Sequence, residues 1–516
     1  MPFPSGGCQT CKLRRIKCDE TQPVCGKCKK SQRTCYGMRT GPWCSVIHLE
    51  NTYASGVAKR PRGPRSTRTV EPARIIAIQQ LPAPNLETRA MNYFWLHHLN
   101  TFTECQDLSK TVYNDFLPIW ISKQECTLLK LSGSCIALAI FSQTQRHPAA
   151  ALAASLIYQK LLQATQKSLF TLSEENIELY LIASFFMGRY EGAVFNPNAM
   201  NSIYSRSRGF SHHMGALSIL KLWKEQYSHL HPPTDVIRHS RQGLIRSAVL
   251  RNAKVPEWML DGTIFGERGF DLEYHRIMIQ ITKIRHQVAG LLRHKKMSCR
   301  SLDELPTIIG DLEGEAVSID NALQEWSSRF PSTWKYGQQQ LPDPYPWPMR
   351  DFYTPTVCSY SSAAHASVWC NYYSTRILIN SARLKILGLG QSVEIADKTG
   401  VQARSNIASM ADHLASSIPF CLERFKVTLP DLSSEQPLIT LNNGQDIKPY
   451  VAHLVIWPLT LAASVGGVDA VQQKWFRCEL ARIGRIVGYG IFESAETDQW
   501  SVNNLSFDYG PDLGEY

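Results

Sequence analysis

The sequence predicts a mainly α-helical protein, built from a small cysteine-rich N-terminal module, a linker and a large all-α body. Seven of the 15 cysteines lie within residues 1–44. Residues 1–74 hold 15 Lys and Arg against 4 Asp and Glu, which equals the net charge of +11 of the whole chain. From about residue 87 onward, apolar residues recur at steps of three and four, which is typical of helices with one buried face. The predicted boundaries are 1–44, 45–86 and 87–516, the last including an acidic and aromatic tail over 493–516.

The composition indicates an intracellular globular protein. Apolar residues make up 44% of the 516 positions, which excludes general disorder. Residues 1–7 (MPFPSGG) lack the apolar segment of a secretory signal, so we expect reduced thiols. Residues 449–468 carry no charge and have the length of a membrane span. Pro458, His453 and the glycine pair at 466–467 favour a buried core helix instead, and we expect no membrane partner.

The N-terminal cysteines form an internal repeat. Each half follows the spacing C-x2-C-x6-C, and the six residues are Cys8, Cys11, Cys18, Cys25, Cys28 and Cys35. A C-x2-C step places two thiolates around a common ion, and structural zinc prefers four ligands. Six sulfurs supply eight bonds to two Zn²⁺ ions only if two sulfurs bridge both metals. The symmetry of the repeat assigns the bridging positions to Cys8 and Cys25.

Two other arrangements of these cysteines remain open. Cys44 and His48 are available as additional ligands for two separate four-ligand sites. A disulfide knot is the second alternative, although the expected reducing compartment argues against it.

Basic residues follow each C-x2-C step, in the runs KLRRIK (12–17) and KKSQR (29–33). A short helix nucleated by each metal would carry these cations on the surface of the module. A merely solvated basic surface is the alternative interpretation. Four cations within six residues of a rigid module favour the binding of a polyanion.

This cysteine pattern resembles that of the fungal binuclear zinc-cluster transcription factors, C-x2-C-x6-C-x5–12-C-x2-C-x6–8-C. The match includes Gly7, the basic run before the third cysteine and Pro23. The resemblance implies a nuclear, zinc-dependent regulator of RNA polymerase II promoters that binds double-stranded DNA. It also implies that the first helix reads a CGG triplet in the major groove. Arg15 matches the family's principal base-reading residue, with Arg14 and Lys17 beside it. The expected phosphate contacts are Lys12, Lys27, Lys29, Lys30 and Arg33.

The linker is basic and contains prolines. Residues 58–68 (AKRPRGPRSTR) hold five cations, and Lys59, Arg60 and Arg62 form a possible nuclear localisation signal. Many family members place a coiled coil here, but this linker lacks a heptad pattern. Two routes to DNA specificity therefore remain: a homodimer formed through the helical body, which we favour, or extra groove contacts from the basic arm.

The body is predicted to be helical throughout, with Ser173 as one N-cap and the Pro-rich segment 341–348 as a loop that divides it. The clearest helical segments are 87–102, 149–167, 173–191, 212–227, 274–296, 365–387 and 404–417. Parts of it (212–220, 255–260 and 476–492) resemble the regulatory domain found downstream of many fungal zinc clusters. The competing functions are a zinc or redox sensor and an enzyme tethered to nucleic acid.

No HExxH, GxSxG or phosphate-loop motif occurs in the body, so we predict that the protein is not an enzyme. Residues 493–516 contain six acids and no Lys or Arg. This tail is either a segment that binds a coactivator or an acidic tail packed on the body. A small-molecule effector is a further expected partner.

Overall fold

The computed structural model divides into two compact units, Met1–Leu81 and Pro82–Tyr516. The described part of the first unit comprises residues 7–8, 10–11, 14, 16–21, 24–32 and 35. The described part of the second comprises 84–99, 112–123, 125–196, 211–297, 305–341, 346–390, 393–428, 438–442, 446–498 and 500. Almost all of the predicted linker, including Lys59, Arg60 and Arg62, lies outside these residues.

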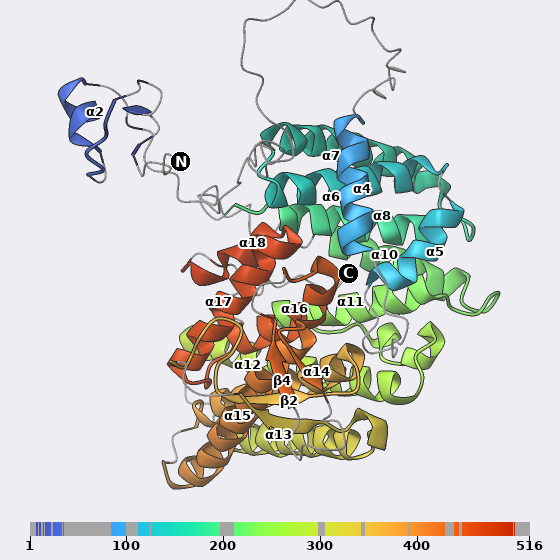
Figure 1. Cartoon of the computed structure of the whole chain (residues 1–516). Helices are drawn as coiled ribbons and strands as arrows, with labels where there is room; N and C mark the ends of the chain where they lie inside the picture. Colours follow the sequence, from blue (N-terminus) through green and yellow to red (C-terminus); the bar gives the residue numbers. More distant parts are fainter. Residues whose placement is uncertain are drawn as a thin grey trace, which may run out of the picture. The chain divides into compact units, whose positions relative to one another are not determined.

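The mainly helical prediction is confirmed (Figure 1). The first unit contains α2 (Gly26–Lys30). The helices of the second unit are α4 (Leu86–His98), α5 (Val112–Ser122), α6 (Thr127–Thr144), α7 (Pro148–Ser168), α8 (Ile177–Ala193), α10 (Ser211–Gln226), α11 (Asp235–Arg251), α12 (Gly269–Met297), α13 (Leu305–Ser328), α14 (Ala363–Leu387), α15 (Val393–Cys421), α16 (Pro449–Ser464), α17 (Ala470–Val487) and α18 (Gly490–Glu493).

Several helices begin at a polar side chain that caps the first turn. Asn85 accepts a hydrogen bond from the N–H of Thr88, and Asp469 accepts bonds from two N–H groups in the first turn of α17. The prediction of Ser173 as an N-cap is wrong. Its carbonyl accepts a bond from the N–H of Ile177, so residues 173–176 form a turn and α8 starts at Ile177.

Two small antiparallel sheets interrupt the helices, although no strand was expected from the sequence. β1 (Gly337–Gln340) pairs with β2 (Thr356–Ser359), and β3 (Phe425–Thr428) pairs with β4 (Leu438–Leu441). The segment 341–348 therefore connects two paired strands and does not divide the body. Strands of four residues are too short to show an alternating apolar pattern, as the sequence GQQQ of β1 illustrates.

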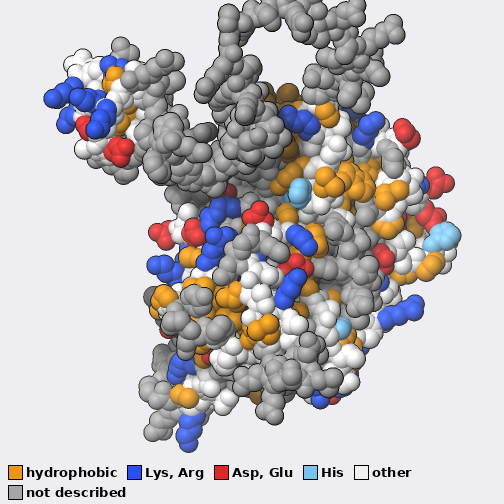
Figure 2. All heavy atoms as spheres, in the orientation of Figure 1, with side chains coloured by type: hydrophobic (Ala, Val, Ile, Leu, Met, Phe, Trp, Pro, Cys, Tyr) orange, Lys and Arg blue, Asp and Glu red, His pale blue; other side chains and the backbone are white. Residues whose placement is uncertain are grey.

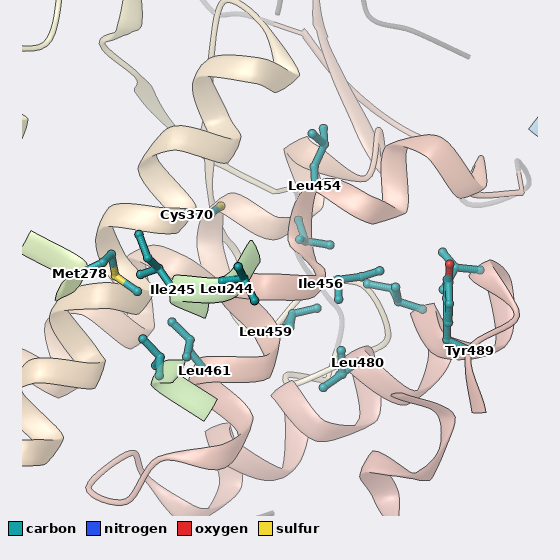
Figure 3. Packing of buried hydrophobic residues seen from close by; sticks show 14 of the residues in the cluster. Leu244, Ile245, Met278, Cys370, Leu454, Ile456, Leu459, Leu461, Leu480 and Tyr489 are labelled. Carbon is teal, nitrogen blue, oxygen red and sulfur yellow. The ribbon is translucent and has the colours of Figure 1, made fainter. Parts of the chain in front are cut away.

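One continuous hydrophobic core extends from α4 to α17. α14 packs against α13, α15 and α16, while α6 packs against α4, α7 and α8. α16 links the two groups because it contacts α4, α14 and α17. Figure 3 shows this region, in which Leu454, Ile456 and Leu459 of α16 lie among buried side chains of other helices.

The uncharged segment around α16 is a core helix, as expected. Thirteen of its residues are buried, among them Pro458 in the middle of the helix. Within the described part of the chain, no helix has the length and apolar character needed to cross a bilayer.

Candidate metal centre and nucleic-acid interface

The two halves of the cysteine repeat adopt the same local structure. In the first half, the N–H of Cys11 donates to Sγ of Cys8 at 3.4 Å. In the second half, the N–H of Cys28 donates to Sγ of Cys25, also at 3.4 Å. Cys25 is the N-cap of α2. The N–H of Arg14 donates to the carbonyl of Thr10, just as the N–H of Ser31 donates to that of Lys27 at the equivalent positions of the second half. The repeat in spacing is thus a repeat in backbone geometry.

The six sulfurs converge on one another. They form two groups of four, Cys8, Cys11, Cys18 and Cys25 in one and Cys8, Cys25, Cys28 and Cys35 in the other. Within each group, all ligand atoms lie within 4.8 Å of one another. Cys8 and Cys25 belong to both groups, and their sulfurs are 3.6 Å apart. Eight metal–sulfur bonds can be drawn from this arrangement only by sharing these two sulfurs.

The chemistry of the sulfur cluster fits a divalent metal. Cys8, Cys11, Cys25 and Cys28 are buried, and burial raises the pKa of the Cys28 thiol to about 12. Packed thiols of this kind need a cation nearby before they release their protons. Backbone N–H groups already stabilise one thiolate, because hydrogen bonds from those of Cys8 and Glu20 lower the pKa of Cys18. A tetrahedral set of four thiolates is the preferred environment of structural zinc.

Two glycines allow the chain to pack closely around the cluster. A Cβ on Gly7 would lie 2.7 Å from Cβ of Cys18, and a Cβ on Gly26 would lie 2.4 Å from Oδ2 of Asp19. The N–H of Gly26 donates to Oδ1 of Asp19 at 3.0 Å. Asp19 therefore holds the start of α2 against the segment that follows the first half of the repeat.

Exposed cations surround the buried sulfurs. Arg14, Lys17, Lys27, Lys29 and Lys30 are all exposed, and none of them forms an ion pair within the described residues. Figure 2 shows Lys and Arg side chains gathered on the surface of this module. A metal-stabilised module with this density of surface cations has the electrostatic character of a nucleic-acid-binding domain.

A contact between the two halves was not foreseen from the sequence. Nη1 of Arg14 donates to Oγ of Ser31 at 3.1 Å, and Ser31 in turn donates to the carbonyl of Lys27 at 2.8 Å. Arg14 and Ser31 each lie six residues after the first cysteine of their own half. They are therefore equivalent positions of the repeat, and this equivalence is the signal in the sequence from which the contact could have been found.

Other predicted site residues lie outside the described part of the chain. These are the base-reading candidate Arg15, the phosphate-contact candidates Lys12 and Arg33, and the alternative ligands Cys44 and His48.

A second group of potential ligands lies in the body, where Glu267, Asp271 and His275 are buried together. The guanidinium of Arg241 forms an ion pair with Glu267, and Gln242 donates to Asp271 at 2.8 Å. A Cβ on Gly262 would lie within 2.4 Å of a carboxylate oxygen of Glu267, so this region is densely packed. We interpret the group as a buried ion-pair cluster rather than a metal site.

Two histidines of the body illustrate structural roles. His212 lies 2.8 Å from the hydroxyl of Tyr158 and 3.2 Å from Glu191. His98 is buried and stacks on Phe94, and burial lowers its pKa to about 3. Both histidines therefore have structural roles: His98 packs in the core, and His212 contacts Tyr158 and Glu191.

Comparison with known proteins identifies the cysteine module. The model of the fungal Zn(2)-Cys(6) binuclear cluster domain matches residues 6–40. The cysteine module is thus similar to a fungal zinc-cluster domain. The resemblance found in the sequence is thereby confirmed for this module, and the match implies that the module binds zinc.

Curated relatives agree with this assignment. Sterol uptake control protein 2 of Candida albicans is 37% identical over 67 residues, which cover 13% of this chain and 9% of the relative. Adhesion and hyphal regulator 1 of the same fungus is 67% identical over 30 residues, 6% of this chain and 5% of the relative. An uncharacterized transcriptional regulatory protein of Schizosaccharomyces pombe is 29% identical over 153 residues, 27% of this chain and 24% of the relative.

The chain thus spans less than a tenth of the length of the first two relatives. No solved structure matches the chain.

Proposed function

We propose that the protein is a nuclear, zinc-dependent transcription regulator that binds CGG-containing promoters of RNA polymerase II. The observation that carries this proposal is the pair of four-sulfur groups that share Cys8 and Cys25, surrounded by exposed cations. Two bridged Zn²⁺ ions would supply the cations that these thiols require. The metal then has a structural role, because all of its ligands are protein sulfurs and no position is left for a substrate.

Base reading is assigned to the first half of the module. Its basic residues Arg14, Arg15 and Lys17 correspond, by position in the repeat, to Ser31, Gln32 and Thr34 in the second half. The two halves share a scaffold but only the first carries cations at these three positions. Arg15 is the proposed guanine-reading residue, since a guanidinium can donate two hydrogen bonds to one guanine. Lys12, Lys27, Lys29, Lys30 and Arg33 are the proposed phosphate contacts.

Selection from a pool of random DNA duplexes with the full-length, zinc-loaded protein tests the proposed sequence preference. We expect CGG triplets to be enriched, and their spacing to report how the protein pairs on DNA. Enrichment that persists after the zinc is removed, or a pool that stays random, would contradict the proposal.

The number of metal ions is tested by native mass spectrometry of the full-length protein. Wild type should hold two zinc ions, and Cys25→Ser should lose both because Cys25 belongs to both sulfur groups. Cys44→Ser is the matched control, since Cys44 belongs to neither group, and it should retain two. One zinc ion in the wild type, or a loss of zinc in Cys44→Ser, would favour separate four-ligand sites.

Pairing through the body and recruitment of a coactivator complete the proposal. Sedimentation of the full-length protein, with and without a duplex of two triplets, tests the homodimer.

The first part of the acidic tail packs on the body: Arg477 donates to the carbonyls of Ala495 and Thr497, and Trp500 is buried. The proposed coactivator segment is therefore limited to residues 501–516.

A further inference from the structure

Two partly buried arginines of the described body lack an ion pair. Several other inward-facing arginines are matched with carboxylates, as in the pairs Arg241–Glu267, Arg376–Asp320, Arg383–Glu313 and Arg482–Glu479. Arg189 of α8 and Arg246 of α11 form no ion pair within the described residues, although both are more than half buried. Burying a guanidinium without a counter-charge is costly, so this pair calls for an explanation.

Aromatic rings surround the two guanidinium groups. Arg189 lies 4.9 Å from the ring centre of Phe185 and 5.5 Å from that of Tyr489. Arg246 lies 5.7 Å from the ring centre of Trp457. These contacts bring side chains of α8, α11, α16 and the turn after α17 to one place.

A histidine completes the connection between the two arginines. His453 lies one helical turn before Trp457 on α16, and its ring centre is 6.2 Å from that of Tyr489. Burial lowers the pKa of His453 well below its ordinary value, and the neighbouring His98 and Arg189 lower it further. The site is therefore cationic, and its histidine is kept neutral by burial and by the neighbouring charge.

The two arginines also act on each other. Burial lowers the pKa of Arg246, Tyr274 and Asp271 raise it, and the charge of Arg189 lowers it further. Asp271 is a weak counter-charge for Arg246, because it already accepts a hydrogen bond from Gln242 and lies 3.3 Å from His275. Nε of Arg246 is buried and has no hydrogen-bond partner within the described residues. A buried N–H group in this state indicates a missing acceptor.

The side chains around this site keep part of their surface accessible. Phe185, Arg189, Arg246 and Trp457 are all partly exposed, in contrast to the fully buried core residues next to them on the same helices. The two arginines and their neighbouring rings therefore lie at the margin of the core rather than in its fully buried centre.

We propose that Arg189 and Arg246 bind the anionic group of a small organic effector, whose apolar or aromatic part lies against the partly exposed rings of Phe185 and Trp457. Guanidinium groups form strong, charge-assisted hydrogen bonds with carboxylates and phosphates. The aromatic rings supply apolar contact area beside that anchor. The proposal concerns the body alone, so it stands or fails independently of CGG recognition by the zinc module.

Thermal unfolding and isothermal titration of the full-length, zinc-loaded protein test this site, with the ionic strength held constant by NaCl. The probes are benzoate, phenyl phosphate, inorganic phosphate and the neutral benzyl alcohol. We expect benzoate or phenyl phosphate to raise the melting temperature in a saturable manner, and benzyl alcohol to have no effect. Which of the two aromatic anions binds more tightly distinguishes a carboxylate from a phosphate effector.

Arg189→Gln and Arg246→Gln should each weaken binding of that anion at least about tenfold, the usual effect of losing a charged hydrogen bond. Arg246→Lys should retain part of the affinity for the anion that Arg246→Gln loses. Arg329→Gln is the matched control, because Arg329 is 48% exposed, follows α13 and pairs with Glu273 of α12, two helices that contribute no ring or guanidinium to the site. If one arginine variant fails to fold, the other provides the comparison.

Three results would overturn the proposal. The first is that none of the anions raises the melting temperature above the value in NaCl. The second is that both arginine variants bind the anion as tightly as Arg329→Gln does. The third is that benzyl alcohol binds as tightly as benzoate, which would show that the guanidinium groups do not recognise the ligand.

Discussion

The zinc-cluster module and the helical body achieve order by different means. In the described part of the module, the buried apolar residues are mainly the cysteines themselves, so the metal must supply what a hydrophobic core supplies elsewhere. The body buries one continuous apolar cluster from α4 to α17. With the metal role proposed above, one chain combines a module whose folding depends on zinc with a body whose folding depends on packing.

Removal of zinc gives the largest expected difference between the two units. Structural zinc contributes about 10–16 kcal/mol of apparent binding free energy in small zinc-folded domains. A chelator should therefore abolish amide protection throughout residues 7–35 and leave the helices of the body protected. Hydrogen exchange of the full-length protein, followed by mass spectrometry, measures both units in one sample. Restored protection after zinc is added back is the control. If the body lost as much amide protection as the module, the proposed difference between the two units would be contradicted.

A cavity in the core should destabilise the body without affecting the zinc module, the reverse of zinc removal. Trp326 is fully buried, and its Nε1 donates to the carbonyl of Phe270 at 3.1 Å. Trp326→Ala should lower the free energy of unfolding by about 3–5 kcal/mol and leave the zinc content unchanged. Phe170 is 94% exposed, so Phe170→Ala should change the free energy of unfolding by less than about 0.5 kcal/mol. Urea unfolding followed by circular dichroism provides the measurement, and similar effects of the two variants would contradict the described core.

A buried histidine should make the stability of the body sensitive to acid. Burial lowers the pKa of His98 to about 3, so the native state keeps it neutral while the unfolded chain takes up a proton near pH 6.5. The unfolded state thus binds more protons between these values, and stability falls as the pH falls. The slope should reach about 1.4 kcal/mol per pH unit in this window. Urea unfolding at several pH values should show a shallower slope for His98→Phe, and an unchanged slope would contradict the assignment.

The smallest expected effect compares the two halves of the module. Arg15→Ala should weaken binding to a CGG duplex by about 1–3 kcal/mol and reduce the preference among triplets. Gln32→Ala, at the equivalent position of the second half, should leave that preference intact. Lys30→Ala should weaken binding to all duplexes and reduce the salt slope by about one unit. Fluorescence anisotropy at several salt concentrations measures all three, and equal loss of preference in Arg15→Ala and Gln32→Ala would refute the asymmetry.

The sequence predicted the module better than the details of the body. Ligand spacing determines which sulfurs can meet, because a metal has a fixed coordination number, so the repeat alone led to the groups seen around Cys8 and Cys25. The helical segments were also predictable, since the apolar period is a local property. The N-cap of α8 was misplaced because Ser173 and Asn176 are both residue types that cap helices, and a local turn holds Ser173: its N–H donates to Oδ1 of Asn176, whose Nδ2 donates to the carbonyl of Thr171.

The remaining features depend on contacts between distant parts of the chain. β1 pairs with β2 across the segment 341–355, and a four-residue strand carries too little pattern to reveal its partner. The arginine pair in the body was equally hidden, because Arg189 and Arg246 lie on different helices and most of their aromatic neighbours come from other elements. Charge and residue type were visible in the sequence, but their common location was not.

The burial of Trp500 has a practical consequence for dividing the protein into fragments. This side chain is 2% exposed and belongs to the same core as α17, although it lies beyond the last helical turn. A fragment of the body that stops at residue 493 would lack this indole and expose the apolar surface beneath it. Such a fragment should aggregate more readily, whereas one that spans residues 84–500 would retain every described member of the core.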